Sequence, residues 1–205
     1  SKANDELKNE VFLKIRNSAN LMNLCKKIFT LNNISENLIK SEEIHMVLGV
    51  RNSQNIEKNN KIKFHFDAYF LTINIPITMP TISATESANQ IGKGELLLLP
   101  NLRNFNQNIF MNIITKIIFQ NPISRWILGY KIIQKKIGIK TISLSETNIY
   151  IFYGYRSLHG VNSYAKNSER TSLLLHILNP HQNSFFDSYI KRRHKNQRIN
   201  HKALN

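Results

Sequence analysis

The most informative part of the chain is Ser157–Ile177, which reads SLHGVNSYAKNSERTSLLLHI. It contains His159 and, eleven residues later, Arg170, which is followed at the second position by Ser172. Strands place residues i and i+2 on the same face, so an Arg-x-Ser in a strand aims a guanidinium and a hydroxyl into one pocket. The stretch therefore predicts an acid-binding pair beside a candidate metal ligand.

A second stretch, Lys63–Ala68, supplies two more candidate ligands, His65 and Asp67. Large apolar residues alternate with them, and this strand pattern places the histidine and the aspartate on the face opposite the apolar side chains. Together with His159 they make two histidines and one carboxylate. Arranged on one face of a metal, this set suits iron(II) and leaves positions for a chelating co-substrate and for dioxygen.

Arg170 and Ser172 fit an anionic co-substrate. If that molecule is 2-oxoglutarate, its far carboxylate needs a cationic anchor, which Arg170 offers as a planar fork and Ser172 supplements with a hydroxyl. We expect His159 on the penultimate strand, a turn over residues 162–169, and Arg170 at the start of the antiparallel return strand.

Composition sets outer limits on the interpretation. A chain of 205 residues suits one domain, residues 1–205, because no turn-rich linker divides it. Its 28 Lys and Arg against 13 acids give a net charge of +15, which favours anionic partners such as nucleic acid, phosphorylated substrates or a membrane surface. The lysines are dispersed, however, and heavy use of Lys, Asn and Ile is also typical of an A/T-biased coding sequence. The charge alone therefore identifies no partner.

The single cysteine, Cys25, excludes an internal disulfide framework and fits a reducing compartment. The polar start, residues 1–6, lacks the apolar core of a signal peptide. Lys116, Gln120 and Arg125 interrupt the most apolar region, so we expect no membrane span. These features predict a soluble, cytoplasmic protein.

Apolar periodicity predicts one helix before the first four strands and a helical region between the fourth and the fifth strand. We expect an N-terminal helix over residues 5–29 and a helical insertion over 105–136 that Pro122 breaks into two helices. Trp126 and Tyr130 in the insertion fit core packing better than substrate stacking. The remaining expectations are strands at 44–50, 62–67, 71–77, 94–100, 140–145, 148–155, 158–161 and 170–178, loops at 52–60 and 81–93, and a basic tail at 185–205.

Eight short strands, with His-x-Asp early and His and Arg-x-Ser late, suit a double-stranded β-helix, the jelly-roll barrel of cupins. The fold class is then mainly β with flanking α. The barrel should occupy about residues 44–180, with the helices packed outside it. The insertion would lie halfway round the barrel, where it could cap a substrate.

The sequence resembles a known family, the Fe(II)/2-oxoglutarate-dependent oxygenases (dioxygenases). The resemblance covers roughly residues 44–180. It rests on five matching segments taken in order, which are His65-Phe66-Asp67, Leu71-Thr72, Gly94 to Pro100, Leu158-His159-Gly160-Val161 and Arg170-Thr171-Ser172. A lone His-x-Asp arises often by chance, and the specificity comes from the ordered set.

The resemblance implies a role for each matched residue. His65, Asp67 and His159 would bind iron, and Arg170 with Ser172 would hold the C5 carboxylate of 2-oxoglutarate. Leu71 or Thr72 would contact this co-substrate. The implied reaction consumes dioxygen, converts 2-oxoglutarate into succinate and CO2, and hydroxylates a substrate by default. Desaturation and ring formation stay open.

Sub-family signals narrow the substrate class. In related halogenases a small residue replaces the carboxylate, so Asp67 argues against halogenation. Nucleic-acid demethylases of the family tend to carry a second arginine where this chain has His176, and prolyl hydroxylases generally use lysine where it has Arg170. A small molecule or peptide, of the amino-acid or natural-product type, is the substrate class that remains.

Several residues are secondary candidates for substrate contact. Asn101, Arg103 and Arg156 flank the expected mouth and could bind an anionic group, although single polar residues at strand ends are more often solvated. Tyr69 and Asn74 follow the His-x-Asp segment. The remaining histidines are interpreted as strand-face or surface residues. Of these, His176 alone is expected on the pocket side, being an even number of residues from Arg170 and Ser172.

The alternative function is a basic jelly-roll protein that binds or modifies nucleic acid. It would use the positive charge and the tail, in which Lys191–Lys195 is strongly basic. That hypothesis predicts tight binding to DNA or RNA with a steep dependence on salt. A solvated tail end is the more ordinary interpretation of such a segment.

Overall fold

The computed structural model describes residues 10–11, 13–34, 44–52, 62–80, 92–104, 109–164 and 168–179. Several expectations fall wholly or partly outside these ranges. They are the first part of the N-terminal helix, the loops at 53–60 and 81–91, the start of the insertion at 105–108, part of the turn before Arg170, and the basic tail.

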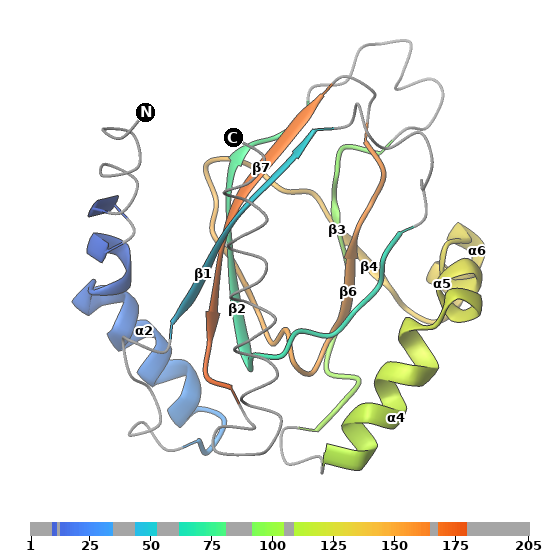
Figure 1. Ribbon diagram of the computed structural model, residues 1–205, viewed down its shortest axis with the longest axis horizontal. Coiled ribbons are helices and arrows are strands. Elements are labelled where there is room, and N and C mark those ends of the chain that lie inside the picture. The colour runs from blue at the N-terminus through green and yellow to red at the C-terminus, as the bar shows by residue number, and fades with distance from the viewer. Residues whose placement is uncertain are drawn as a thin grey trace, which may run out of the picture.

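Two antiparallel sheets form the body of the molecule (Figure 1). The larger has the order β1-β7-β2-β5, and the smaller has the order β4-β3-β6. A sheet-rich, mainly β architecture with a few helices is therefore consistent with the predicted fold class. The strands are β1 (His45–Asn52), β2 (Leu71–Thr78), β3 (Leu96–Leu99), β4 (Lys140–Ile142), β5 (Tyr150–Phe152), β6 (Leu158–Val161) and β7 (Glu169–Ile177).

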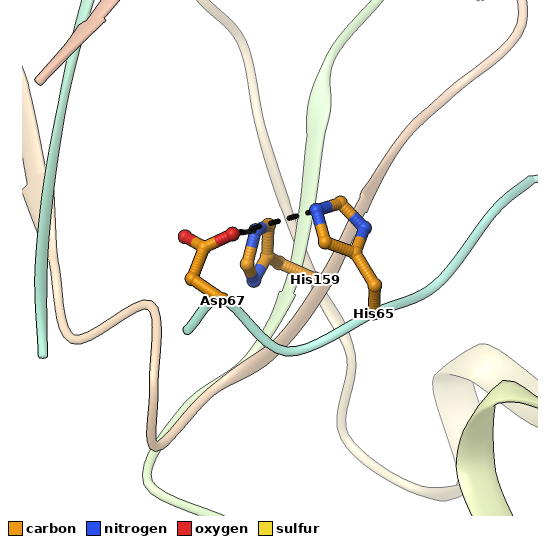
Figure 2. A group of neighbouring side chains, drawn as sticks. All are labelled: His65, Asp67 and His159. Carbon is orange, nitrogen blue, oxygen red and sulfur yellow. Dashed lines mark ion pairs between the residues drawn. The ribbon is translucent and has the colours of Figure 1, made fainter. Parts of the chain in front are cut away.

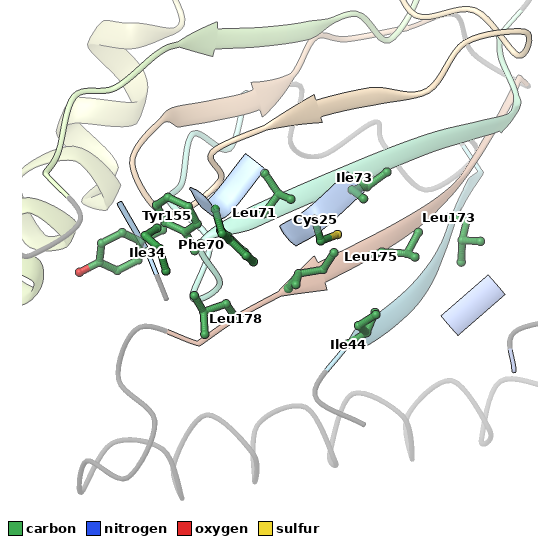
Figure 3. Close-up of a cluster of buried hydrophobic side chains, with 12 residues drawn as sticks. Cys25, Ile34, Ile44, Phe70, Leu71, Ile73, Tyr155, Leu173, Leu175 and Leu178 are labelled. Atoms are coloured by element: carbon green, nitrogen blue, oxygen red, sulfur yellow. The ribbon is translucent and has the colours of Figure 1, made fainter. Parts of the chain in front are cut away.

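The outer face of the larger sheet packs on helix α2 (Ala19–Thr30). Alternation along β2 and β7 sends Leu71, Ile73 and Leu175 to this side, where they meet Cys25 and Phe29 of the helix (Figure 3). Burial raises the pKa of the Cys25 thiol to about 11, so the thiol is protonated at neutral pH and acts as a small apolar side chain.

A second apolar cluster lies on the outer face of the smaller sheet. Phe64 and Phe66 join Leu97 of β3 and Leu158 of β6, and Leu128 of the helical insertion covers them. Because both sheets turn apolar side chains outward onto helices, their other faces are directed toward each other. Phe152 of the larger sheet and His159 of the smaller sheet contact across this inner space, with ring centroids 4.9 Å apart.

Two predicted elements in the first half of the chain differ from the expectation. The helix expected over residues 5–29 is interrupted at Asn17, because Ser18 adopts extended backbone angles and its hydroxyl accepts a hydrogen bond from Leu21 N to begin α2. The strand expected over 62–67 is reduced to a short extended segment. This segment forms only a single antiparallel bridge, between His65 and His159.

β6 has the predicted bounds and β7 is shifted by one residue, whereas three other strands are shorter than predicted and one pairing differs. β3 spans 96–99, β4 spans 140–142 and β5 spans 150–152. Arg170 does begin the last strand region, within β7, but β7 does not return beside His159. β6 and β7 lie in different sheets, and β7 pairs with β1 and β2 instead.

The described part of the helical insertion, residues 109–136, contains three helices rather than two. The break at Pro122 is confirmed, with Asn121 as N-cap, but a second break follows at Gly129. The helices are α4 (Ile109–Gln120), α5 (Pro122–Leu128) and α6 (Lys131–Lys136). Trp126 and Tyr130 are 53% and 46% exposed, so the expectation that they pack in the core is wrong.

Within the ranges that the structure describes, no helix has both the length and the apolar character needed to cross a membrane.

The packing between α2 and the larger sheet predicts a large cost for shortening Leu175, which is fully buried. Leu175→Ala should lower the free energy of unfolding by about 2–5 kcal/mol, because the lost transfer energy and the cavity add. Leu31→Ala is the control, since Leu31 is 84% exposed. Urea denaturation measures both, and equal losses in the two variants would contradict the assigned core.

Candidate metal centre

His65, Asp67 and His159 converge in space, although 92 residues separate Asp67 from His159 (Figure 2). Asp67 Oδ1 lies 3.6 Å from His65 Nε2 and 3.4 Å from His159 Nε2. One ligand atom from each residue lies within 4.8 Å of the others. Three donors thus surround a point at which a single metal ion could be bound.

Backbone pairing brings the two imidazoles together. His65 N donates to His159 O at 2.8 Å, and His159 N donates to His65 O at 2.9 Å. The two rings consequently lie 4.3 Å apart between centroids. Phe64 and Phe66, on either side of His65, point the other way into the cluster under the helices. This apolar anchoring confirms the predicted alternation and turns His65 and Asp67 to the inner side.

The same hydrogen-bond arrangement holds both imidazoles. His65 Nδ1 lies 3.0 Å from Lys63 O, and His159 Nδ1 lies 3.0 Å from Ser157 O. A carbonyl oxygen can only accept, so each Nδ1 carries the hydrogen and donates it. In the neutral tautomer each Nε2 then has a lone pair that a metal ion could bind, whereas a protonated ring can donate from Nε2 to Asp67. Such outer hydrogen bonds fix the orientation of a metal-binding histidine and raise its basicity.

Asp67 is held just as firmly by its other oxygen. Thr72 Oγ1 donates to Asp67 Oδ2 at 2.5 Å, and Asp67 N donates to Gly154 O at 3.0 Å. Since the Thr72 hydroxyl has one hydrogen, its contact with His176 Nδ1 at 3.1 Å is accepted from the histidine. Oδ2 is therefore occupied within the protein, and Oδ1 is directed to the two Nε2 atoms.

The electrostatics of the site favour a bound cation. Burial would by itself raise the pKa of Asp67, but the positive charges of His159 and His176 and hydrogen bonds from the imidazoles hold it well below its usual range. Burial would likewise lower the pKa of His159, yet the charge of Asp67 and its hydrogen bond raise it. A buried ionised carboxylate is stable only when paired with positive charge.

This donor set fits a divalent transition metal. Two imidazoles and one carboxylate on one side are the arrangement of the facial triad, which leaves further coordination positions open for other molecules. Iron(II) binds such ligands, and so do manganese(II) and cobalt(II). The side-chain exposure of His65 is 43%, against 7% for His159, so the site is open on the His65 side.

Arg170 and Ser172 lie on the same face of β7 as His176, which is 3.8 Å from Asp67 through Nδ1. Arg170 is 5% exposed, and its Nε donates to Gly94 O at 3.3 Å. Ser172 is 2% exposed, and its Oγ has no hydrogen-bond partner among the described residues. The predicted Arg-x-Ser pair therefore faces the inner space that also holds the His-Asp-His group.

Two other polar candidates in β2 and before it also lie near this group. Asn74 is 3% exposed and sits two residues from Thr72 on the same strand face, and its Oδ1 lacks a partner in the described part of the chain. Tyr69 stacks on His45 and on His176, with ring centroids 5.6 Å apart in both cases. His176 thus lies on the pocket side, as predicted.

Leu71 does not face the site. It is 1% exposed and belongs to the apolar cluster under α2, because strand alternation sends it away from Thr72. Thr72 remains close to the donors, but its observed contacts are with Asp67 and His176. Of the two residues expected to touch a co-substrate, only Thr72 lies on the inner face.

The side chains of Arg103 and Arg156 donate hydrogen bonds to backbone carbonyls of the protein. Arg103 is 2% exposed, not solvated, and its guanidinium lies 3.8 Å from the Phe66 ring centroid and donates to the Tyr155 carbonyl. Burial lowers the pKa of Arg103 to about 10. Arg156 Nε donates to Arg103 O at 2.9 Å. Asn101 is exposed at the end of β3, with φ 54°.

Sequence reasoning missed Gly154. A Cβ built at this position would lie 2.2 Å from Asp67 Oδ2 and 2.3 Å from Thr72 Oγ1, so only glycine allows the backbone to approach the carboxylate. No periodic pattern identifies this role, because Gly154 lies in a turn after β5 and contacts residues more than eighty positions away.

The chain matches no known family model, and no curated protein matches its sequence.

Removing the carboxylate charge should abolish most metal binding. For Asp67→Asn we expect at least tenfold weaker binding of manganese(II) or cobalt(II), because the amide keeps the shape but loses the charge. Isothermal titration measures the affinity, and cobalt(II) absorption reports its ligands. Glu10→Gln, at an exposed acid on the N-terminal helix, is the matched control. Unchanged affinity in Asp67→Asn would contradict the centre.

Gly154→Ala should impair the same centre without altering any donor. The added methyl group would displace Asp67 Oδ2 and Thr72 Oγ1, so metal affinity should fall by about tenfold or more, as for other losses of supporting contacts. Gly49→Ala is the control, since its Cβ would meet only Ser172 O, at 3.7 Å. Titration of both variants, with circular dichroism to establish folding, separates the two outcomes.

Proposed function

We propose that this chain is an Fe(II)- and 2-oxoglutarate-dependent oxygenase that hydroxylates a small molecule or peptide, with release of succinate and CO2. The proposal rests on the set of residues found together in the inner space between the sheets. This space contains the convergent His65, Asp67 and His159, and also the Arg170 and Ser172 pair on the neighbouring sheet face.

The strand pairing supports a jelly-roll fold for this proposal. Counting the His65 segment as a strand gives eight in chain order. The two middle strands of the eight, β3 and β4, pair with each other, and the strands on either side of them, β2 and β5, pair next. The His65 segment then pairs with β6, and the first strand, β1, pairs with the last, β7. This nested antiparallel order is what a long hairpin produces when it is rolled into a double sheet.

When bound, iron(II) would supply the activation of dioxygen that the side chains of the protein cannot provide. His65 and His159 would each hold it through Nε2, and Asp67 through Oδ1. The Lys63 and Ser157 carbonyls keep the imidazoles oriented, and Thr72 prevents rotation of the carboxylate.

Arg170 and Ser172 would anchor the far carboxylate of 2-oxoglutarate. A buried hydroxyl without a partner costs about 1–3 kcal/mol, and a bound carboxylate would remove that cost at Ser172 Oγ. Gly94 keeps room for the arginine. Its φ is +71°, and a Cβ there would lie 3.0 Å from Arg170 Cδ. The geometry thus favours an anionic ligand reaching from β7 toward the metal donors.

Asn74 is the residue we place closest to substrate recognition. Its Oδ1 is buried and lacks a partner within the described ranges, and it lies on the inner strand face beside Thr72. An acceptor in this position selects a substrate or co-substrate that carries an N–H or O–H group. Asp67 fills the carboxylate position, which favours hydroxylation over halogenation.

The proposal is tested by iron-dependent formation of succinate from 2-oxoglutarate. Uncoupled turnover can be measured without the natural substrate. We expect activity with iron(II) that is lost in His159→Ala, while Glu10→Gln, at an exposed acid far from the donor set in sequence, retains it. Normal turnover by His159→Ala would refute the assignment.

Arg170→Gln separates co-substrate anchoring from metal binding. The variant loses the charged fork, so the KM for 2-oxoglutarate should rise by about tenfold or more, since hydrogen bonds to charged groups contribute roughly 1.5–3 kcal/mol. Its manganese(II) affinity should match that of the unmodified chain. Arg125→Gln on α5 is the control. An unchanged KM in Arg170→Gln would exclude this residue as the anchor.

A further inference from the structure

Helix α4 has an inverted distribution of side chains. Asn112 is 5% exposed and contacts buried Arg103, whereas Phe110 and Ile117 on the opposite side are 73% and 63% exposed. A helix on the surface of a protein in water normally does the reverse, burying its apolar stripe against the core. The apolar stripe of α4 therefore faces away from the sheets.

The next two helices continue the pattern. Ile123 on α5 is 71% exposed and Ile132 on α6 is 77% exposed, while Gln134 is 8% exposed and its side-chain amide donates to Leu128 O. Between the isoleucines, Trp126 and Tyr130 pack edge to face with centroids 5.1 Å apart. We call Phe110, Ile117, Ile123, Trp126, Tyr130 and Ile132 the outer helical face.

The segment that carries this face has a net positive charge. Residues 109–145 contain no Asp or Glu, and the first acid after them is Glu146. Over the same residues the sequence has six basic side chains, Lys116, Arg125, Lys131, Lys135, Lys136 and Lys140. Their charge favours an anionic surface opposite the helices and repels a second copy of this basic chain.

We propose that the outer helical face binds the surface of a lipid bilayer that contains anionic lipids. Exposed isoleucines and a phenylalanine would enter the boundary between headgroups and acyl chains. Trp126 and Tyr130 would lie at headgroup level, as such amphipathic rings do, and the lysines would contact lipid phosphates. The proposal is independent of the reaction assigned to the metal centre.

The helices fit binding in the plane of the interface. α4 has 12 residues, so it is about 18 Å long against about 30 Å of hydrocarbon. α4, α5 and α6 lie together at one side of the molecule, and α2 lies at the other side of the sheets (Figure 1). The insertion can therefore contact a bilayer without disturbing the core between α2 and the larger sheet.

Trp126 provides a direct probe, because it is the only tryptophan in the chain. Vesicles of phosphatidylcholine, with or without phosphatidylglycerol, should be mixed with the full chain and separated by flotation. We expect flotation with the phosphatidylglycerol vesicles, a blue shift of Trp126 fluorescence, and quenching by lipids brominated on the acyl chains. High salt should weaken binding, because the lysine contribution is screened.

Surface variants locate the contact. Ile117→Ser with Ile123→Ser should reduce vesicle affinity by at least tenfold. Lys136→Gln, at an exposed lysine four residues after Ile132 on α6, should reduce it selectively for anionic vesicles. Both isoleucines are exposed, so the fold should persist, which circular dichroism checks. Ile149→Ser, at a residue 61% exposed outside the helices, is the matched control and should bind normally.

Three results would overturn the proposal. The first is an absence of flotation with anionic vesicles at low salt. The second is Trp126 fluorescence that is already blue-shifted in the free chain and does not respond to brominated lipid, which would show that the chain covers this face itself. The third is a dimer in sedimentation that the Ile117 and Ile123 substitutions dissociate, which would assign the face to self-association.

Discussion

The two backbone hydrogen bonds between His65 and His159 are the constraint on which the candidate centre depends. They join the His-x-Asp segment to β6 and set the imidazoles side by side. A slip of one residue in this pairing would turn the imidazoles to the opposite face, away from Asp67, because it reverses the direction of every side chain. Phe64 and Phe66 hold the register from the opposite face.

The two faces of each sheet differ in polarity. Each sheet packs an apolar face outward against helices, and the inner faces carry histidine, aspartate, threonine, asparagine, serine and arginine beside apolar residues such as Leu98 and Phe152. Burying these polar groups is costly unless they have hydrogen-bond partners. Most are satisfied by one another, and Ser172 Oγ and Asn74 Oδ1 are exceptions among the described residues. Both lie where a polar ligand would complete them.

The supporting residues act through geometry more than through charge. Thr72 Oγ1 donates to Asp67 Oδ2, and the backbone N–H of Asp67 donates to Gly154 O, so both ends of this residue are fixed. The guanidinium of Arg103 lies over the ring of Phe66. From the sequence, Arg103 is a candidate for substrate contact because it flanks the expected mouth of the barrel, although an arginine near a strand end is more often solvated. In the structure its donors are directed to Tyr155 and Asn112, which makes it part of the scaffold.

The sequence by itself identified His65, Asp67 and His159 as candidate metal ligands and predicted which strand faces they share. Residues two apart in a strand share a face, so the neighbouring sequence alone predicts which way His65 points and that Arg170, Ser172 and His176 lie on one face. Tertiary structure decided the rest. The separate sheets of β6 and β7, the close approach of Gly154 to Asp67, and the outward direction of the α4 stripe depend on contacts between distant segments. Local periodicity reports that a face is apolar, but not what that face contacts.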